Sequence, residues 1–440
     1  MRQKIQQFSQ RPFVRNVAAV AGGTAASQAI SMAFSPLITR LYGPEAYGIQ
    51  GVFMSIAGII GTIAAMTYPI AIVLPKSDTD ALGLARLSIY IGIVTSLLVT
   101  LALFLFGQEI LSLLNAQEIS AFMYLIPVSM LIAVAGGVVN QWLIRKKAFI
   151  LTAKVAVWQT LLMSTVKAGL GFVYPTAAVL VVTNISSDLL STVLMLLGLR
   201  RGRVRHIIEQ AETKDSESGL GEWELAKRHR DFPLLRAPQV LLNAASQSLP
   251  ILLLANYFGV TAAGFYSIAT VVLGVPAGLI GNSVKQVFYP RFNEAVHNRE
   301  NLSALMLKTI ISMGMIGLLP FSVVMVFGPS LFDVVFGAAW RTAGEYGRWL
   351  AIWFFFELIN RPVVSAIPVI RLQGVFLIYE ILSVLLRVAA LYIGFVVLQS
   401  DVGAVAVFSV AGVALSISLN LYVIWSCRTA DIRCWKSEYR

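Results

Sequence analysis

The chain has 440 residues, of which 57% are hydrophobic and only 13% are charged, and its formal net charge is +12 at pH 7. A soluble domain would carry about 25% charged residues, so this composition, with a mean hydropathy of +0.77, excludes an ordinary soluble protein. Apolar runs of about 20 residues recur along the chain, and each is long enough to cross a hydrocarbon core of about 30 Å. Because backbone groups in lipid must be satisfied internally and the runs are continuous rather than alternating, we expect an all-α polytopic membrane protein.

Neither the net charge nor the cysteines indicate a nucleic-acid-binding or metal-binding protein. Basic residues gather at the cytoplasmic helix ends of membrane proteins in general, and no basic stripe here alternates with aromatic residues as a nucleic-acid groove would require. The two cysteines, Cys427 and Cys434, lie near the C-terminus without a CxxC spacing. A disulfide scaffold and a metal centre are therefore not expected.

Breaks between the apolar runs predict twelve membrane-spanning helices. They cover residues 14–36, 48–74, 84–106, 119–144, 150–172, 176–198, 232–256, 262–288, 302–326, 344–368, 374–398 and 402–426. A basic stretch precedes the first run, as in a signal peptide. That run has a counterpart later in the chain, however, so we expect it to be retained as a span.

Lysine and arginine residues determine the predicted orientation. If the N-terminus is inside, the expected outer loops contain only Arg40, Arg341 and Arg348. The basic segments then fall on the inner side at every loop. Both termini are therefore expected to be cytoplasmic, in a multi-pass membrane protein.

The longest hydrophilic segment, residues 199–231, lies in the middle of the chain and carries charges of both signs. We expect it to be a solvated cytoplasmic linker. It would separate an N-terminal six-helix lobe, residues 1–198, from a C-terminal six-helix lobe with a cytoplasmic tail, residues 232–440.

The two halves resemble each other in sequence. Residues 41–48 read Leu-Tyr-Gly-Pro-Glu-Ala-Tyr-Gly and residues 257–264 read Tyr-Phe-Gly-Val-Thr-Ala-Ala-Gly, and both segments join the first helix of a half to the second. An Ala-Ala-Ser-Gln segment occurs at 25–28 and again at 244–247. Because each half holds an even number of spans, the repeat is parallel and pseudo-symmetric, which is typical of a transporter with its substrate path between the halves. A static scaffold of two similar halves is the alternative.

The first span of each half is rich in hydroxyl and amide side chains, which helices that face only lipid would not carry. Gln28 and Ser31 lie in the first span, and Asn243 and Gln247 lie in the seventh. We expect these side chains to line a hydrated cavity. Close helix packing through small residues is the alternative.

Residues 35–48, Ser-Pro-Leu-Ile-Thr-Arg-Leu-Tyr-Gly-Pro-Glu-Ala-Tyr-Gly, follow a basic N-terminus. This opening, with the span count, the repeat and the central loop, resembles the polysaccharide-transporter flippases, which include the O-antigen and exopolysaccharide repeat-unit translocases. They share a superfamily with the multidrug extruders and the lipid II flippase. The resemblance implies a V-shaped pair of lobes around a cationic cavity, and an undecaprenyl-diphosphate-linked oligosaccharide as substrate. The two additional C-terminal helices of the lipid II flippase have no counterpart among the predicted spans, which argues against lipid II.

A diphosphate in a low-dielectric cavity requires cations, and arginine offers paired donors for it. The basic residues that we expect to contact it are Arg40, Lys285, Arg361 and Arg387.

Acidic residues at membrane depth are costly and therefore indicate function. The candidates for ion coupling are Asp188, Glu357 and Glu380. Glu357 stands four residues before Arg361, the favourable order for an ion pair on a helix, so mutual neutralisation is the alternative for that pair. For Asp188 the alternative is a hydrogen bond to a neighbouring serine or helix. Lys167, near the outer end of its span, can extend its amine toward the interface, which would be a structural rather than a functional role.

The sequence offers little for an enzyme. Asp78-Thr79-Asp80 has the DxD pattern of metal-dependent glycosyltransferases, but we interpret it as a solvated turn in an inner loop. The histidines, all in expected inner loops and without metal spacing, are His206, His229 and His297. No nucleophile stands beside a base, and no Walker-type loop indicates direct use of ATP.

The sequence therefore predicts a flippase that moves a lipid-linked oligosaccharide to the periplasmic leaflet by alternating access, without a cofactor. Its expected partners are the lipid-linked substrate, the bilayer and a polysaccharide polymerase or export complex. A cation-coupled multidrug extruder of the same superfamily is the main alternative, and a membrane-embedded glycosyltransferase or polymerase is the second.

Overall fold

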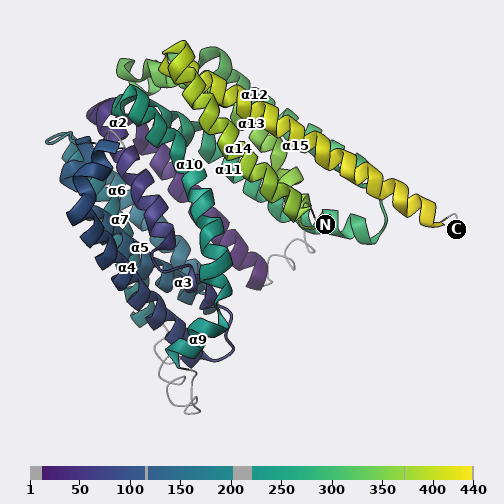
Figure 1. Cartoon of the computed structure of the whole chain (residues 1–440), viewed down its shortest axis with the longest axis horizontal. Coiled ribbons are helices and arrows are strands. Elements are labelled where there is room, and N and C mark those ends of the chain that lie inside the picture. The colour runs from purple at the N-terminus through teal and green to yellow at the C-terminus, as the bar shows by residue number, and fades with distance from the viewer. Residues whose placement is uncertain (1–11, 114–116, 202–220, 371, 439–440) are drawn as a thin grey trace. The chain divides into compact units, whose positions relative to one another are not determined.

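The computed structural model describes residues 12–113, 117–201, 221–370 and 372–438, and in these residues every regular element is a helix (Figure 1). The expected all-α class is confirmed. By their contacts the elements separate into two units, Met1–Asn256 and Tyr257–Arg440, which are described in turn.

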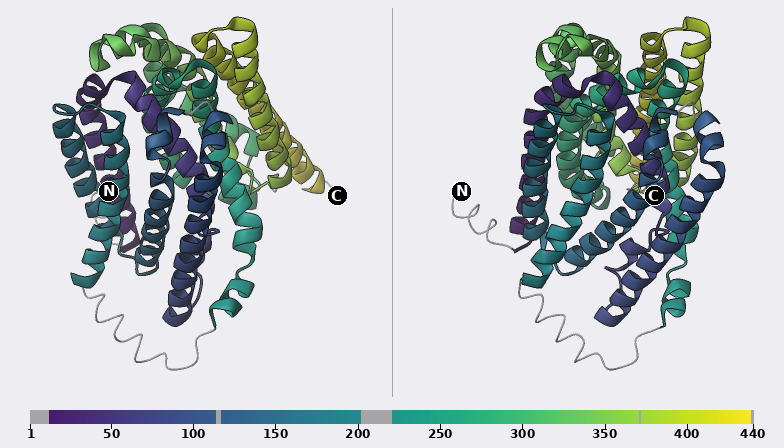
Figure 2. Two further views of the ribbon diagram at one scale, coloured as in Figure 1. Left: turned by 60° about the vertical axis from the view of Figure 1, so that its left-hand side comes forward. Right: turned by 90° about the vertical axis from the view of Figure 1, so that its left-hand side faces the viewer.

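Unit 1 contains a set of long helices and several short ones. They are α2 (Pro12–Ile63), α3 (Tyr68–Ala71), α4 (Asp78–Leu113), η1 (Gln117–Phe122), α5 (Leu125–Arg145), α6 (Phe149–Gly171), α7 (Ala177–Arg201), α9 (Glu222–Arg228), η2 (Phe232–Arg236) and α10 (Ala237–Phe258). Helix α2 packs mainly against α6, α5 packs against α4 and α7, and α6 packs against α7. The views of Figure 2 show these helices, purple to teal, lying alongside one another.

Helix α2 contains two of the predicted spans, joined at a single residue. Gly43 interrupts the helix with φ 71° and ψ 171°, a conformation that is essentially restricted to glycine. Gly259, its counterpart in the sequence repeat, immediately precedes α11 (Val260–His297) with φ 86° and ψ 166°. The two glycines of the repeated motif thus adopt the same backbone conformation, as expected for equivalent positions of a repeat. The loop that the sequence predicted between residues 36 and 48 is replaced by this one-residue break.

The second predicted span, residues 48–74, is not one helix. Helix α2 ends at Ile63, and Met66 and Thr67 have positive φ angles of 47° and 60°. Helix α3 then begins with a proline in its first turn. A proline at a helix start needs no backbone donor, so the chain restarts there as a separate short helix, which hydropathy alone does not reveal.

Unit 2 is arranged around one helix. Its elements are α11, α12 (Leu302–Phe336), η3 (Ala338–Trp340), α13 (Arg341–Ala366), α14 (Gln373–Ile393), η4 (Gly394–Leu398) and α15 (Asp401–Glu438). Helix α13 packs against α11, α12 and α15. The α12–α13 contact is close because Gly328 and Gly344 face each other: a Cβ built on Gly344 would lie 2.5 Å from the Gly328 carbonyl oxygen. Larger residues there would separate the two helices.

Ten helices in the described part of the chain are long and apolar enough to cross a membrane, and the first of them, Val20–Ile63, includes both arms of α2. Helix α13, at the predicted span 344–368, is not among the ten. It carries charges, including Glu357 and Arg361, and these are tolerated because most of its surface is covered by neighbouring helices. Each predicted span thus falls on helical segments, although the span 48–74 is divided between α2 and α3, and the crossing of the bilayer by all twelve stays a prediction.

The units divide between Asn256 and Tyr257, within α10, rather than at the predicted linker 199–231. Residues 202–220 of that linker lie outside the described part. Its end is described, however, and α9 packs against α4 in unit 1. The lobe boundaries expected from the sequence, 1–198 and 232–440, stay predictions.

Candidate functional site

Polar residues join α6 and α7 in unit 1. The Gln159 side-chain amide donates to the Ser187 carbonyl oxygen at 3.0 Å and to its hydroxyl at 2.8 Å. Further along the same two helices the Lys167 amine donates to the Asn184 side-chain oxygen. These bonds run between two helices, so the Lys167 amine is held against α7.

Asp188 lies one turn beyond Asn184 on α7 and interacts electrostatically with Lys167. The sequence left open whether another helix supplies a cation for this carboxylate, and α6 supplies one. The Asp188 side chain is exposed on unit 1. It is therefore a charge-compensated acid that other groups can still reach.

The same region holds the arm of α2 that precedes Gly43. The Tyr42 hydroxyl donates to the Lys167 carbonyl oxygen at 2.7 Å, and Tyr42 packs with Ile38, Ala46, Ala168 and Leu180 in a buried apolar cluster. Lys167 thus contacts α7 through its amine and holds α2, next to the break at Gly43, through its carbonyl oxygen. We call Gln159, Lys167, Asn184, Ser187 and Asp188 the α6–α7 polar seam.

In unit 2 the charged residues of α13 and α14 lie together. Nη2 of Arg361 is 3.3 Å from Oε1 of Glu357, and both side chains are a little over one-third exposed, at 39% and 35%. The predicted pair on α13 therefore forms. On α11, Gly281 makes room for the arginine, since a Cβ there would lie 3.0 Å from Arg361 Cγ.

The charges on α14 also find partners. The guanidinium carbon of Arg387 lies 4.9 Å from the centre of the Trp353 ring on α13, within the range of a cation–π contact. Glu380 interacts electrostatically with Arg387. We call Glu357, Arg361, Glu380 and Arg387, with Trp353, the unit 2 charge cluster.

This cluster brings two predicted substrate-binding cations next to two predicted coupling acids, so its formal charge is zero when all four groups are ionised. Among the described residues, the Nε atoms of Arg361 and Arg387 are buried without a hydrogen-bond partner. Buried polar atoms usually have a partner, so both guanidinium groups retain donor capacity. A site with this composition can bind an anion, at Arg361 above all, and can exchange a proton or cation at its carboxylates.

The remaining predicted residues are less closely associated. On α10 the Gln247 side-chain amide donates to the Asn243 side-chain oxygen at 2.9 Å, and both residues are exposed. On α2, Gln28 is half-buried and Ser31 and Arg40 are exposed, with Arg40 one turn before Gly43.

The Lys285 side chain lies outside the described part of the structure. The gathering of Arg40, Lys285, Arg361 and Arg387 around one cavity therefore stays a prediction.

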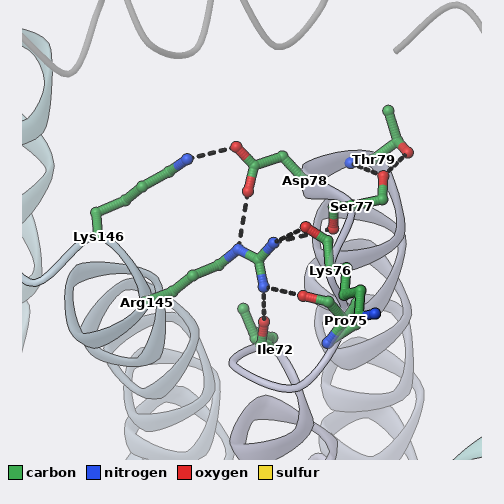
Figure 3. Close-up of polar contacts among 8 residues, drawn as sticks. All are labelled: Ile72, Pro75, Lys76, Ser77, Asp78, Thr79, Arg145 and Lys146. Atoms are coloured by element: carbon green, nitrogen blue, oxygen red, sulfur yellow. Dashed lines mark hydrogen bonds and ion pairs between the residues drawn. The ribbon is translucent and has the colours of Figure 1, made fainter.

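The DxD pattern has a structural explanation (Figure 3). Asp78 accepts a hydrogen bond from Arg145 Nε at 2.8 Å through one carboxylate oxygen and from the Lys146 amine through the other. The guanidinium group of Arg145 also donates to a run of backbone carbonyl oxygens, at Ile72, Pro75, Lys76 and Ser77. Asp78 is thus occupied in fixing the α3–α4 connection to the end of α5, and it is not the solvated turn that the sequence analysis expected. Within the described residues no group of three or more His, Cys, Asp or Glu side chains could hold a metal ion.

Sequence reasoning did not single out Gln159, Asn184, Gly281 and Trp353 as site residues. Gln159 on α6 and Asn184 on α7 could have been noticed as polar residues in apolar spans. Gly281 and Trp353 gave no such signal, because their role depends on which side chain faces them from another helix.

Comparisons with known proteins identify the family and the fold of the chain. The family model described as polysaccharide biosynthesis protein matches residues 37–345. The succinoglycan biosynthesis transport protein ExoT of Rhizobium meliloti (strain 1021) is 23% identical over 316 residues, which cover 70% of this chain and 59% of that protein. The chain thus spans less than two thirds of the length of this relative.

Two solved structures show the fold. An inward-facing multidrug resistance MATE family transporter of the MOP superfamily has a TM-score of 0.69 at 17% identity, covering 92% of this chain and 95% of its own. The lipid II flippase MurJ in an inward closed conformation has a TM-score of 0.68 at 13% identity, covering 94% and 90%. The protein is a multi-pass membrane protein with the fold of these transporters. Since the family model covers most of the chain, the chain belongs to the polysaccharide biosynthesis protein family.

Proposed function

We propose that the chain is a flippase that moves an undecaprenyl-diphosphate-linked oligosaccharide from the cytoplasmic to the periplasmic leaflet of a bacterial inner membrane. The family match over residues 37–345 is the observation that carries the proposal. The relative ExoT is named a transport protein for biosynthesis of a polysaccharide, and the MOP-superfamily fold supports alternating access between two lobes of six helices each. A polysaccharide polymerase or export complex would receive the product.

Arg361 and Arg387 are the groups that we propose for the diphosphate. Both lie on helices of the transporter fold, and the Arg361 side chain is 39% exposed. Guanidinium groups bind phosphate oxygens through paired hydrogen bonds. The adjacent carboxylates, Glu357 and Glu380, are the proposed ion-coupling groups, together with Asp188 in unit 1. A carboxylate that competes with the substrate for the same arginine would link substrate release to proton or cation uptake.

The test is accumulation of the substrate in cells that lack the gene. We expect an undecaprenyl-linked saccharide to build up on the inner leaflet, and surface polysaccharide to be lost. Arg361→Gln should reproduce this defect, because it removes the proposed phosphate ligand. Arg341→Gln is the matched control, since Arg341 lies at the start of the same helix with its side chain 67% exposed. Normal surface polysaccharide without any accumulated intermediate would contradict the proposal.

A multidrug extruder is the second candidate, because the MATE family transporter has the same fold. The two functions differ in substrate charge: cationic drugs favour a cavity in which acids dominate, whereas this cluster contains as many arginines as acids. Drug sensitivity of the deletion strain separates them. An unchanged sensitivity, with a loss of surface polysaccharide, is the result that we expect.

The proposed orientation places both termini in the cytoplasm. Reporter fusions after Arg205 and after Arg440 should therefore report a cytoplasmic location, and fusions at Gln108 and Gln399 a periplasmic one. A periplasmic C-terminus would mean that the number of spans is odd and that the six-plus-six repeat is wrong.

A further inference from the structure

The short helix α9 is a docked part of unit 1. Leu225 is only 1% exposed, and its side chain fills the space over Gly83 of α4, where a Cβ would lie 2.5 Å from Leu225 Cδ1. The Tyr68 hydroxyl donates to the Ala226 carbonyl oxygen at 3.1 Å, and the Thr67 hydroxyl donates to the Phe232 carbonyl oxygen at 3.0 Å. Figure 1 shows α9 at the end of unit 1, just before α10. The segment therefore has one fixed face, which is turned toward α3 and α4.

The opposite face carries a large apolar group. Trp223 is 84% exposed, and Lys227, one turn later, is also exposed. Each is two residues from Leu225, which is more than half a helical turn. Both therefore lie on the side of α9 away from Leu225. Beyond α9, Leu234 and Leu235 are 66% and 72% exposed. These two leucines lie in the first turns of a helix that is apolar enough to span a membrane, Phe232–Phe258. Only the three residues 229–231 separate the end of α9, at Arg228, from Phe232, where this helix begins.

This surface carries four exposed cations and three acidic residues, a formal charge of +1. Its exposed cations are Lys227, Arg228, Arg230 and Arg236, and its acidic residues are Glu222, Glu224 and Asp231. His229 adds no charge at neutral pH, because burial lowers its pKa below the ordinary 6.5.

We propose that α9, η2 and the first turn of α10 form a docking surface for anionic phospholipid headgroups. Tryptophan favours the membrane–water interface, where its ring meets the acyl boundary and its N–H meets water. Basic side chains beside it are attracted to the negative surface of the leaflet. Continuity with a membrane span places the exposed leucines and Trp223 at headgroup depth, so lipid covers them. The docked face then holds the lipid-bound segment on unit 1 and fixes the entry of α10 into the bilayer.

The test uses the full-length protein in nanodiscs with brominated acyl chains, which quench tryptophan emission at the interface. The emission of Trp223 is obtained as the difference between wild type and Trp223→Phe. In bilayers of phosphatidylcholine mixed with phosphatidylglycerol we expect bromination to remove at least half of this difference emission. In pure phosphatidylcholine, or in the Lys227→Gln/Arg230→Gln variant, quenching should fall at least twofold. The Lys76→Gln/Lys154→Gln variant, which removes two charges outside this segment, should behave as wild type.

Two results would overturn the proposal. Trp223 emission that is insensitive to brominated lipid but quenched by aqueous iodide would place the surface in water, as a protein-docking face would be. Quenching that is equal in neutral and anionic bilayers and unchanged by the charge variant would exclude recognition of anionic headgroups. Both readouts are independent of transport, so they stand whether or not the proposed flippase activity is correct.

Discussion

Replacing Arg145 by glutamine tests whether the α3–α4 connection is held by one guanidinium group. In the structure the side chains of Arg145 and Asp78 are only 10% and 20% exposed, and the arginine also serves several backbone carbonyl oxygens between Ile72 and Ser77. Removing one partner of a largely buried pair costs about 3–5 kcal/mol when the remaining charge is left unpaired. Here Lys146 still pairs with Asp78, so the main loss is the donors to the backbone carbonyl oxygens, and an acceptor left without a partner costs about 1–3 kcal/mol. Glutamine can restore about one neutral hydrogen bond, worth about 1 kcal/mol. We therefore expect Arg145→Gln to lower the free energy of unfolding by about 2–4 kcal/mol.

The assay is equilibrium unfolding of the purified protein in mixed micelles with increasing denaturing detergent, with a double-mutant cycle. Asp78→Asn should also destabilise, and the double variant should lose less than the sum of the two single variants, by about 0.5–3 kcal/mol for residues in contact. Lys154→Gln is the control, since Lys154 is exposed on α6 and such surface changes stay within about 0.5 kcal/mol. If Arg145→Gln is no worse than this control, or if the two changes are additive, the reasoning about this contact is refuted.

Three further predictions concern the break in α2, the α6–α7 polar seam and pH. Gly43→Ala should lower the free energy of unfolding by about 1–3 kcal/mol in the same assay, because φ 71° and ψ 171° are strained for any residue with a Cβ. The cost comes from the backbone alone, since nothing lies within 4 Å of a Cβ built there. A cost near zero would contradict this reasoning. Lys167→Met and Asp188→Asn should each lower the free energy of unfolding more than the double variant does, because the double variant leaves no charge unpaired. If Asp188 couples transport, Asp188→Asn should also abolish the response of export to a pH gradient. Arg291 donates to Glu300 at 3.1 Å and lowers the pKa of Glu300 below its ordinary 4.5. The free energy of unfolding of the wild type, relative to Glu300→Gln, should therefore be constant above pH about 5 and decline as the pH falls below that ordinary pKa. A difference that grows on acidification would contradict the assigned contact.

Several features of the protein follow from sequence because they are local. The class of the chain and the approximate positions of its spans depend on how much apolar surface each segment carries. The described helices agree with the class and, apart from the division of residues 48–74 between α2 and α3, with the positions. The repeated glycine motif predicts equivalent joints, and Gly43 and Gly259 adopt the same conformation. The Glu357–Arg361 contact is likewise local, since residues four apart on a helix face each other, and the pair forms.

Contacts between helices were decided only by the tertiary structure. Hydropathy fixes neither the rotation of a helix about its axis nor its shift along a neighbour, and these two quantities determine which side chains meet. The sequence could not reveal that Lys167 turns to Asn184 or that Arg387 lies over Trp353. The same holds for Asp78, whose motif suggested a solvated turn, because its partners Arg145 and Lys146 come from the end of α5. Burial of α13 among three helices is also a tertiary property, and it explains how a charged segment occupies the centre of unit 2.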